Sequence, residues 1–170
     1  FARKDSGSYY TPDELVLLII DETLAPLIYD AYEAFDKAIA SLGKTDSEAS
    51  KLRALEAADP AKAITRLRVC DPAMGSGHFL VSLVDRLTNA ALEAMAKAVE
   101  IAGAAGVEDY QSPIATEIES VRSTIWHNAQ SQDWAITEEQ LDDPQLVKRM
   151  VLKRCVHGVD KNPMAVELAK

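Results

Sequence analysis

The chain has 170 residues, of which 48% are hydrophobic and 26% are charged, enough apolar content for one domain with a packed core. Its formal net charge of −9 disfavours a surface that binds nucleic acid unaided, because such surfaces are normally rich in lysine and arginine. The longest apolar run, residues 15–20, is too short to span a bilayer, and two widely separated cysteines favour a reducing cytoplasm over a disulfide framework.

Helices are predicted for most of the first region, residues 1–60. Thr11 is followed by proline and two acids, which is typical of a helix start because threonine caps well and acids stabilise the positive helix end. We expect the apolar run after it to form a buried helix that Pro26 interrupts. A second helix with an apolar stripe follows, and then a shorter one capped by Asp46 or Ser47.

Two short strands are predicted in the second region, residues 61–170, at residues 67–70 and 155–159. Several helices lie between them, so we expect a helical insertion at about residues 103–153. Helices, a strand, a long helical excursion, a second strand and a helix make half of a doubly wound α/β unit. The predicted fold is therefore α/β, mostly helical, with two short parallel strands adjacent in one sheet.

A glycine pair lies in residues 71–80, which read DPAMGSGHFL. A strand that enters a glycine turn and opens a helix is the usual binding site for a nucleotide cofactor, because glycine lets the backbone approach the ligand. A glycine pair alone would be equally consistent with a tight turn that binds nothing. The dinucleotide pattern needs a third glycine where Leu80 stands, which disfavours a dinucleotide oxidoreductase.

The whole of this string resembles the cofactor motif of DNA adenine methyltransferases, D-P-x-x-G-S-G-x-F. The resemblance implies a truncated Rossmann-like methyltransferase fold and S-adenosylmethionine as the cofactor. It also implies that Gly75 and Gly77 contact the cofactor and that Asp71 faces its methionine amino group.

Asp160 follows the second predicted strand in residues 157–163, which read HGVDKNP. A carboxylate at a strand tip can accept hydrogen bonds from both hydroxyls of a ribose, although an acid considered alone is more typical of a surface or helix-cap position. Residues 154–170 resemble the corresponding segment of type IIG restriction–modification enzymes and related phage-defence methyltransferases. This resemblance implies that Asp160 binds the ribose of the cofactor.

A third motif lies upstream, where residues 7–12 read GSYYTP. One interpretation is a helix cap with two packing tyrosines. The string also resembles the family motif G-x-[FY]-Y-T-P, which implies that Tyr10 and Thr11 contribute to the cofactor pocket, where a helix start can bind a carboxylate. The order of tyrosine block, glycine loop and ribose acid is typical of adenine-N6 enzymes with an N-terminal cofactor region.

The catalytic motif of this family, Asn-Pro-Pro-Tyr or a close variant, does not occur in the sequence. We therefore expect an S-adenosylmethionine-binding fragment of an adenine-N6 methyltransferase that has no catalytic residue and reaches DNA through its parent protein. An uncovered sheet edge in such a fragment is expected to self-associate. We expect no membrane partner and no metal site, because the histidines and cysteines lack ligand spacing.

Two other functions remain open. An RNA or protein-glutamine methyltransferase shares the glycine loop, and a non-catalytic interaction module could retain a vestigial cofactor site. Outside the motifs, Cys70 and Cys155 are expected to be buried strand residues rather than nucleophiles. Trp126 and Trp134 are expected to form the small core of the insertion.

Overall fold

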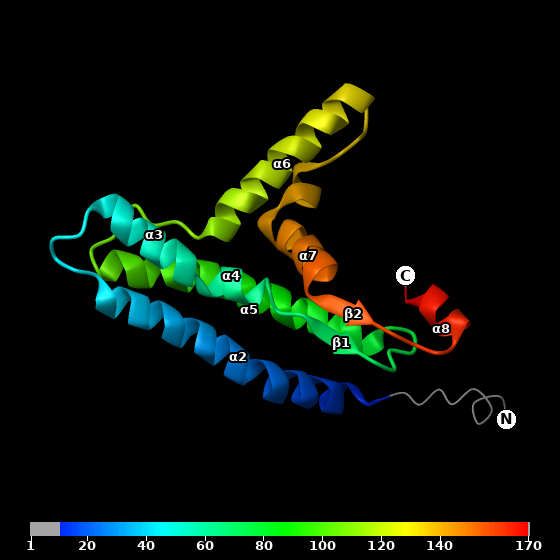
Figure 1. Cartoon of the computed structure of the whole chain (residues 1–170). Coiled ribbons are helices and arrows are strands. Elements are labelled where there is room, and N and C mark those ends of the chain that lie inside the picture. Colours follow the sequence, from blue (N-terminus) through cyan, green and yellow to red (C-terminus); the bar gives the residue numbers. More distant parts are fainter. Residues whose placement is uncertain (1–10, 170) are drawn as a thin grey trace.

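The computed structural model describes residues 11–169, so residues 7–10 of the tyrosine block, Tyr10 among them, lie outside the described residues. It is mostly helical with one two-stranded sheet, as the α/β prediction requires (Figure 1). In chain order the elements are α2 (Asp13–Ser41), α3 (Glu48–Ala58), α4 (Pro60–Ile64), β1 (Val69–Asp71), α5 (His78–Ala104), α6 (Pro113–Gln132), the 3-10 helix η1 (Glu138–Leu141), α7 (Asp143–Arg154), β2 (Val156–Gly158) and α8 (Pro163–Leu168). Within residues 11–169 no helix is long and apolar enough to cross a membrane.

The first helix is continuous through Pro26, so the prediction of two separate helices was wrong. A proline inside a helix removes one backbone hydrogen bond and costs about 3 kcal/mol. Buried side chains on both sides of it, among them Leu24 and Phe35, anchor both halves of α2 in the core. Because burying each such side chain stabilises by roughly 1.5–3 kcal/mol, packing outweighs the local preference.

The apolar run in α2 is helical, but it is buried on one face only, which corrects the expectation of a buried helix. Val16 and Ile20 are fully buried, whereas Leu15, Leu17 and Leu18 are 45–55% exposed. The helix lies along α4 and α5, which cover one side of it (Figure 1). The remaining apolar side chains of the run face outward from this contact.

Two clusters of buried side chains form the core. The larger one joins α2, α4, α5, α6 and α7 and includes Ile20, Ile64, Leu87, Ile118 and Val151. The smaller one lies where α2, α3 and α5 meet the segment that follows α5. In that cluster the hydroxyl of Tyr110 donates a hydrogen bond to the buried carboxylate of Asp59 at 2.7 Å.

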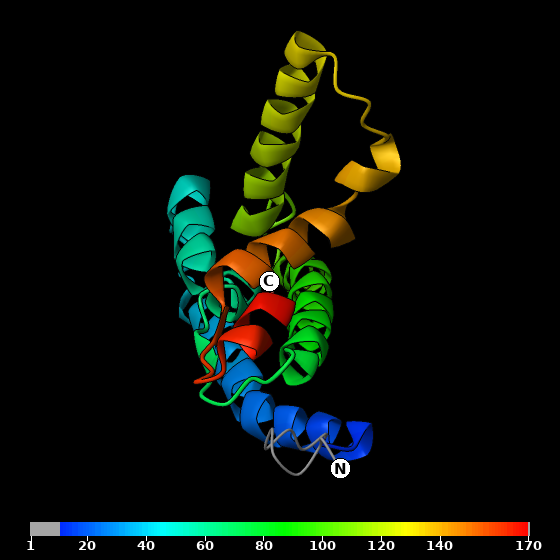
Figure 2. The ribbon, with the colours of Figure 1, turned by 90° about the vertical axis from the view of Figure 1, so that its right-hand side faces the viewer.

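Helix α6 projects away from this body in both views (Figure 1 and Figure 2). Trp126 and Trp134 are 41% and 55% exposed, so the expectation that they form a small core of the insertion was wrong. The buried side chains of α6 are Ile114, Ile118 and Ala129, and Trp134 lies beyond the end of this helix. Ser112 caps α6, and a capping box of Thr137 and Gln140 starts η1.

Strands β1 and β2 are parallel neighbours, as predicted, with Val69 opposite Val156 and Asp71 opposite Gly158. Each strand is one or two residues shorter than expected, and Asp71 belongs to the first one. Cys155 is buried just before β2, whereas Cys70 is exposed, so the expectation for Cys70 was wrong. In β1 the side chain of Cys70 points to the opposite face of the sheet from the side chains of Val69 and Asp71. The described residues leave that face of the two strands largely uncovered.

Candidate functional site

The glycine turn connects β1 to α5 and has the conformation that its sequence predicts. Gly75 and Gly77 have φ values of +53° and +83°, a region that other residues adopt only with strain. A Cβ added to Gly75 would meet no heavy atom within 4 Å, so the backbone conformation rather than crowding requires glycine there. Gly77 is the N-cap of α5, and a Cβ added to it would lie 3.3 Å from Cβ of Ala169.

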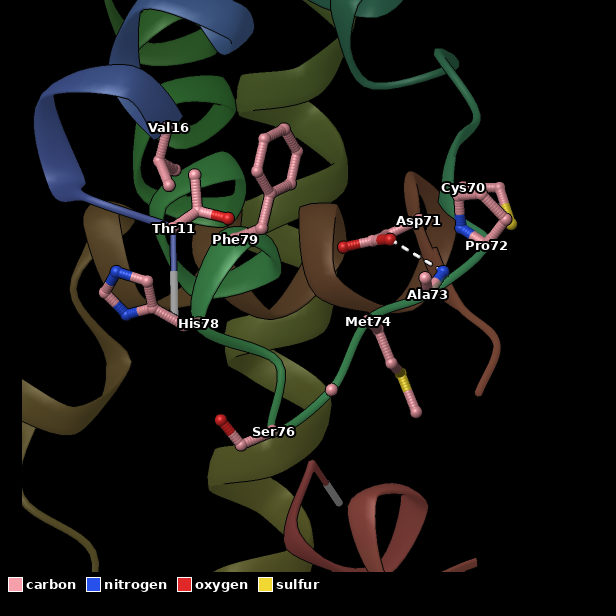
Figure 3. Close-up of a pocket in the computed structure, with 11 residues that line it drawn as sticks. Thr11, Val16, Cys70, Asp71, Pro72, Ala73, Met74, Ser76, His78 and Phe79 are labelled. Atoms are coloured by element: carbon pink, nitrogen blue, oxygen red, sulfur yellow. Dashed lines mark hydrogen bonds between the residues drawn. The ribbon is translucent and has the colours of Figure 1, made fainter. Parts of the chain in front are cut away.

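Asp71 braces the start of this turn. One of its carboxylate oxygens accepts a hydrogen bond from the backbone N–H of Ala73 at 2.9 Å. Figure 3 shows this bond and the other carboxylate oxygen pointing away from the turn. The side chain is therefore held in place while one oxygen stays available to a cationic partner.

A pocket of about 360 Å³ lies against the turn and brings two of the three sequence motifs together. Thr11 and Val16 contribute from the start of α2, and Asp71 and Gly75 contribute from the end of β1 and the turn. Phe79 lines the pocket from the first turn of α5 (Figure 3). The full set of lining residues is Thr11, Val16, Cys70, Asp71, Pro72, Ala73, Met74, Gly75, Ser76, His78 and Phe79.

The starts of two helices meet at this pocket. A ring nitrogen of His78, the first residue of α5, lies 2.7 Å from a carboxylate oxygen of Asp13, the first residue of α2. No side chain of the described residues caps the N-terminus of α5 by a hydrogen bond. Helix starts carry partial positive charge and backbone N–H donors, so this side of the pocket suits an anionic group.

Asp160 does not line the pocket but is bonded directly to the turn that does. Its carboxylate accepts hydrogen bonds from the N–H of Gly75 at 2.9 Å and from the N–H of Asn162 at 2.7 Å. The hydrogen bond from Asn162, followed by that from Gly75, holds the pKa of Asp160 below its ordinary value. A carboxylate has about four acceptor positions, so this anion retains capacity for further donors.

Of the six predicted cofactor residues, the structure thus gathers Thr11, Asp71, Gly75 and Asp160 in one place. Gly77 is buried and caps α5 without lining the pocket, and Tyr10 lies outside the described residues. The described residues also contain no cluster of histidine, cysteine and acidic side chains that could hold a metal ion.

Sequence reasoning missed the contact between the turn and β2. The N–H of Val159 donates to the carbonyl of Asp71 at 2.9 Å, and the N–H of Met74 donates to the carbonyl of Val159 at 3.1 Å. A Cβ added to Gly158 would lie within 2.1 Å of the Met74 sulfur. The available signal was a glycine inside a predicted strand, which often marks a close approach.

Comparison with known proteins finds one similar sequence. Over 94 residues, 50% of this chain, it is 31% identical to a protein of Methanocaldococcus jannaschii named as a type II restriction enzyme and methyltransferase. The aligned segment corresponds to 8% of that protein's length. No protein-family model matches the chain, and no solved structure matches it. The chain is therefore similar, over half of its length, to part of a protein named as a restriction enzyme and methyltransferase.

Proposed function

We propose that this chain is the S-adenosylmethionine-binding part of a DNA adenine-N6 methyltransferase from a restriction–modification or phage-defence system. The observation that carries the proposal is the pocket in which Thr11, Asp71 and Gly75 meet, with Asp160 bonded to Gly75. These residues come from three separate motifs that resemble one family. The similarity to a protein named as a restriction enzyme and methyltransferase supports the methyltransferase part of the proposal.

The groups around the pocket fit a zwitterionic amino acid moiety. The carboxylate of Asp71 can pair with an ammonium group, and the Thr11 hydroxyl with the nearby helix starts can bind a carboxylate. Val16 and Phe79 supply apolar contact between these two ends. The pocket volume of about 360 Å³ lies in the range of small-molecule sites.

Asp160 would hold the sugar of the same cofactor. It is anionic at neutral pH, and its lowered pKa favours that form further, so it is a strong acceptor for hydroxyl donors. The bound cofactor supplies the electrophilic methyl group. The residues of this chain would bind the cofactor and orient its methyl group. Holding a reactant in the right geometry lowers the barrier to such a transfer. The proposal assigns recognition of DNA and transfer of the methyl group to other parts of a longer protein.

Calorimetric titration of the 170-residue chain with S-adenosylmethionine and with its demethylated product tests the proposal. Asp71→Asn keeps an oxygen for the Ala73 N–H but loses the charge, so binding should weaken about tenfold or more. Asp36→Asn removes an exposed acid of α2 and is the matched control, with no expected effect.

Two outcomes would contradict the proposal. Binding of a nicotinamide dinucleotide in preference to S-adenosylmethionine would support an oxidoreductase. A folded chain that binds none of these compounds would support an interaction module with a vestigial site.

A further inference from the structure

The glycine turn is held against the end of β2 by three hydrogen bonds. Two join the backbones of residues 71–74 to Val159, at 2.9 and 3.1 Å, and the third joins Gly75 to the Asp160 carboxylate. The turn and its partner segment are 85 residues apart in sequence. The position of the turn that lines the pocket therefore depends on its contacts with Val159 and Asp160 as well as on its own sequence.

Gly158 adds a steric contribution to this contact. A Cβ built on it would lie 2.1 Å from Sδ of Met74, 3.2 Å from Cγ of Met74 and 2.7 Å from Cδ1 of Leu80. The first and last of these distances are far inside van der Waals contact, so an added Cβ would push aside the ends of the Met74 and Leu80 side chains. The Met74 side chain packs directly against the Cα of Gly158. Met74 immediately precedes Gly75 of the turn.

We infer that Gly158 is a positioning residue for the pocket, although it does not line it. By carrying no side chain it lets Met74 and Leu80 pack onto β2, and this packing places the N–H groups of Met74 and Gly75 at Val159 and Asp160. The steric part of this inference stands on packing alone. Its consequence for cofactor binding rests on the proposed function.

Hydrogen exchange of the Met74 and Gly75 amides, followed by NMR on the full chain, tests the steric part without any ligand. In Gly158→Ala the added methyl group should displace the Met74 side chain, loosen the hydrogen bonds of the turn to Val159 and Asp160, and speed exchange at both amides about tenfold or more. Gly103→Ala is the matched control, because a Cβ added to Gly103 meets no heavy atom within 4 Å. Exchange at the two amides should stay unchanged in that control.

A double-mutant cycle separates this contact from general damage to the fold. Two of the three close contacts belong to Met74, so Gly158→Ala should have much less effect when Met74→Ala is already present. The double variant should then resemble Met74→Ala alone. Unchanged exchange in Gly158→Ala, or equal effects of Gly158→Ala in the two backgrounds, would overturn the inference.

Titration of the same variants with S-adenosylmethionine tests the consequence for the pocket. Affinity should fall about tenfold in Gly158→Ala and remain that of the wild type in Gly103→Ala. If the wild type binds no cofactor, the proposed function fails while the exchange measurements still decide the steric inference. If the wild type binds and Gly158→Ala binds equally well, the positioning role fails and the proposed function stands.

Discussion

The carboxylate of Asp160 accepts a hydrogen bond from the backbone N–H of Gly75, 2.9 Å away and 85 residues earlier in the chain. A second backbone donor, the N–H of Asn162, lies 2.7 Å from the other carboxylate oxygen. Considered as a sequence, Asp160 has two interpretations, a ribose ligand or a surface or helix-cap acid. In the structure Asn162 rather than Asp160 is the N-cap of α8, and the carboxylate of Asp160 is bonded to the turn where the proposed cofactor would bind.

Replacement of Asp160 by alanine should therefore affect both stability and binding. The variant leaves the N–H groups of Gly75 and Asn162 without their carboxylate, so its melting temperature should fall below that of the wild type. If Asp160 also accepts the ribose hydroxyls, affinity for S-adenosylmethionine should fall about ten- to a hundred-fold. Thermal melts and calorimetric titration of both proteins measure these effects. An unchanged melting temperature would show that the two backbone contacts contribute little to stability.

The stability of the protein should depend on pH through the ionisation of the same carboxylate. Hydrogen bonds from Asn162 and Gly75 lower the pKa of Asp160, so folding favours the ionised form. A lowered folded-state pKa contributes stability that is complete above the ordinary pKa of an aspartate and is lost as the pH falls through the folded-state pKa. The difference in melting temperature between the wild type and Asp160→Asn should thus be constant near neutral pH and shrink in strong acid. A difference that grows on acidification would contradict this assignment.

The sequence predicts those features that short-range chemistry decides. Ser47 is the N-cap of α3, one of the two caps expected there, because a hydroxyl next to free N–H groups stabilises a helix start wherever the helix lies. The left-handed glycine turn after β1 follows from Gly75 and Gly77 for the same local reason.

Features that depend on distant packing were not predictable in this way. The exposure of Trp126 and of Cys70 depends on which elements cover them, and hydrophobicity alone does not determine that. The contact between Met74 and Gly158 joins two segments that are far apart in sequence, and only the complete fold brings them together. Within the candidate site, the motifs named most of the residues that the structure gathers, but they did not indicate how the turn is held against β2.

The buried pair of Tyr110 and Asp59 leads to a prediction about the second core cluster. Burial, followed by the hydrogen bond to Asp59, raises the pKa of Tyr110 above its usual value, so the phenol remains a donor to the carboxylate. Tyr110→Phe removes this donor while the Lys62 N–H still donates to the other oxygen of Asp59. The variant should lose about 1–3 kcal/mol of unfolding free energy, measured by urea denaturation. Tyr29→Phe, at a site 67% exposed, is the matched control and should match the wild type.

Pro26 gives the last prediction, because α2 continues through it at the cost of one backbone hydrogen bond. Its side chain is exposed, so alanine can replace it without opening a cavity in the core. Pro26→Ala restores the missing N–H and a residue of high helix propensity, and it should raise the unfolding free energy by up to about 3 kcal/mol. Urea denaturation of the variant and the wild type measures the change. A less stable variant would show that Pro26 favours the packing of α2 along α4 and α5.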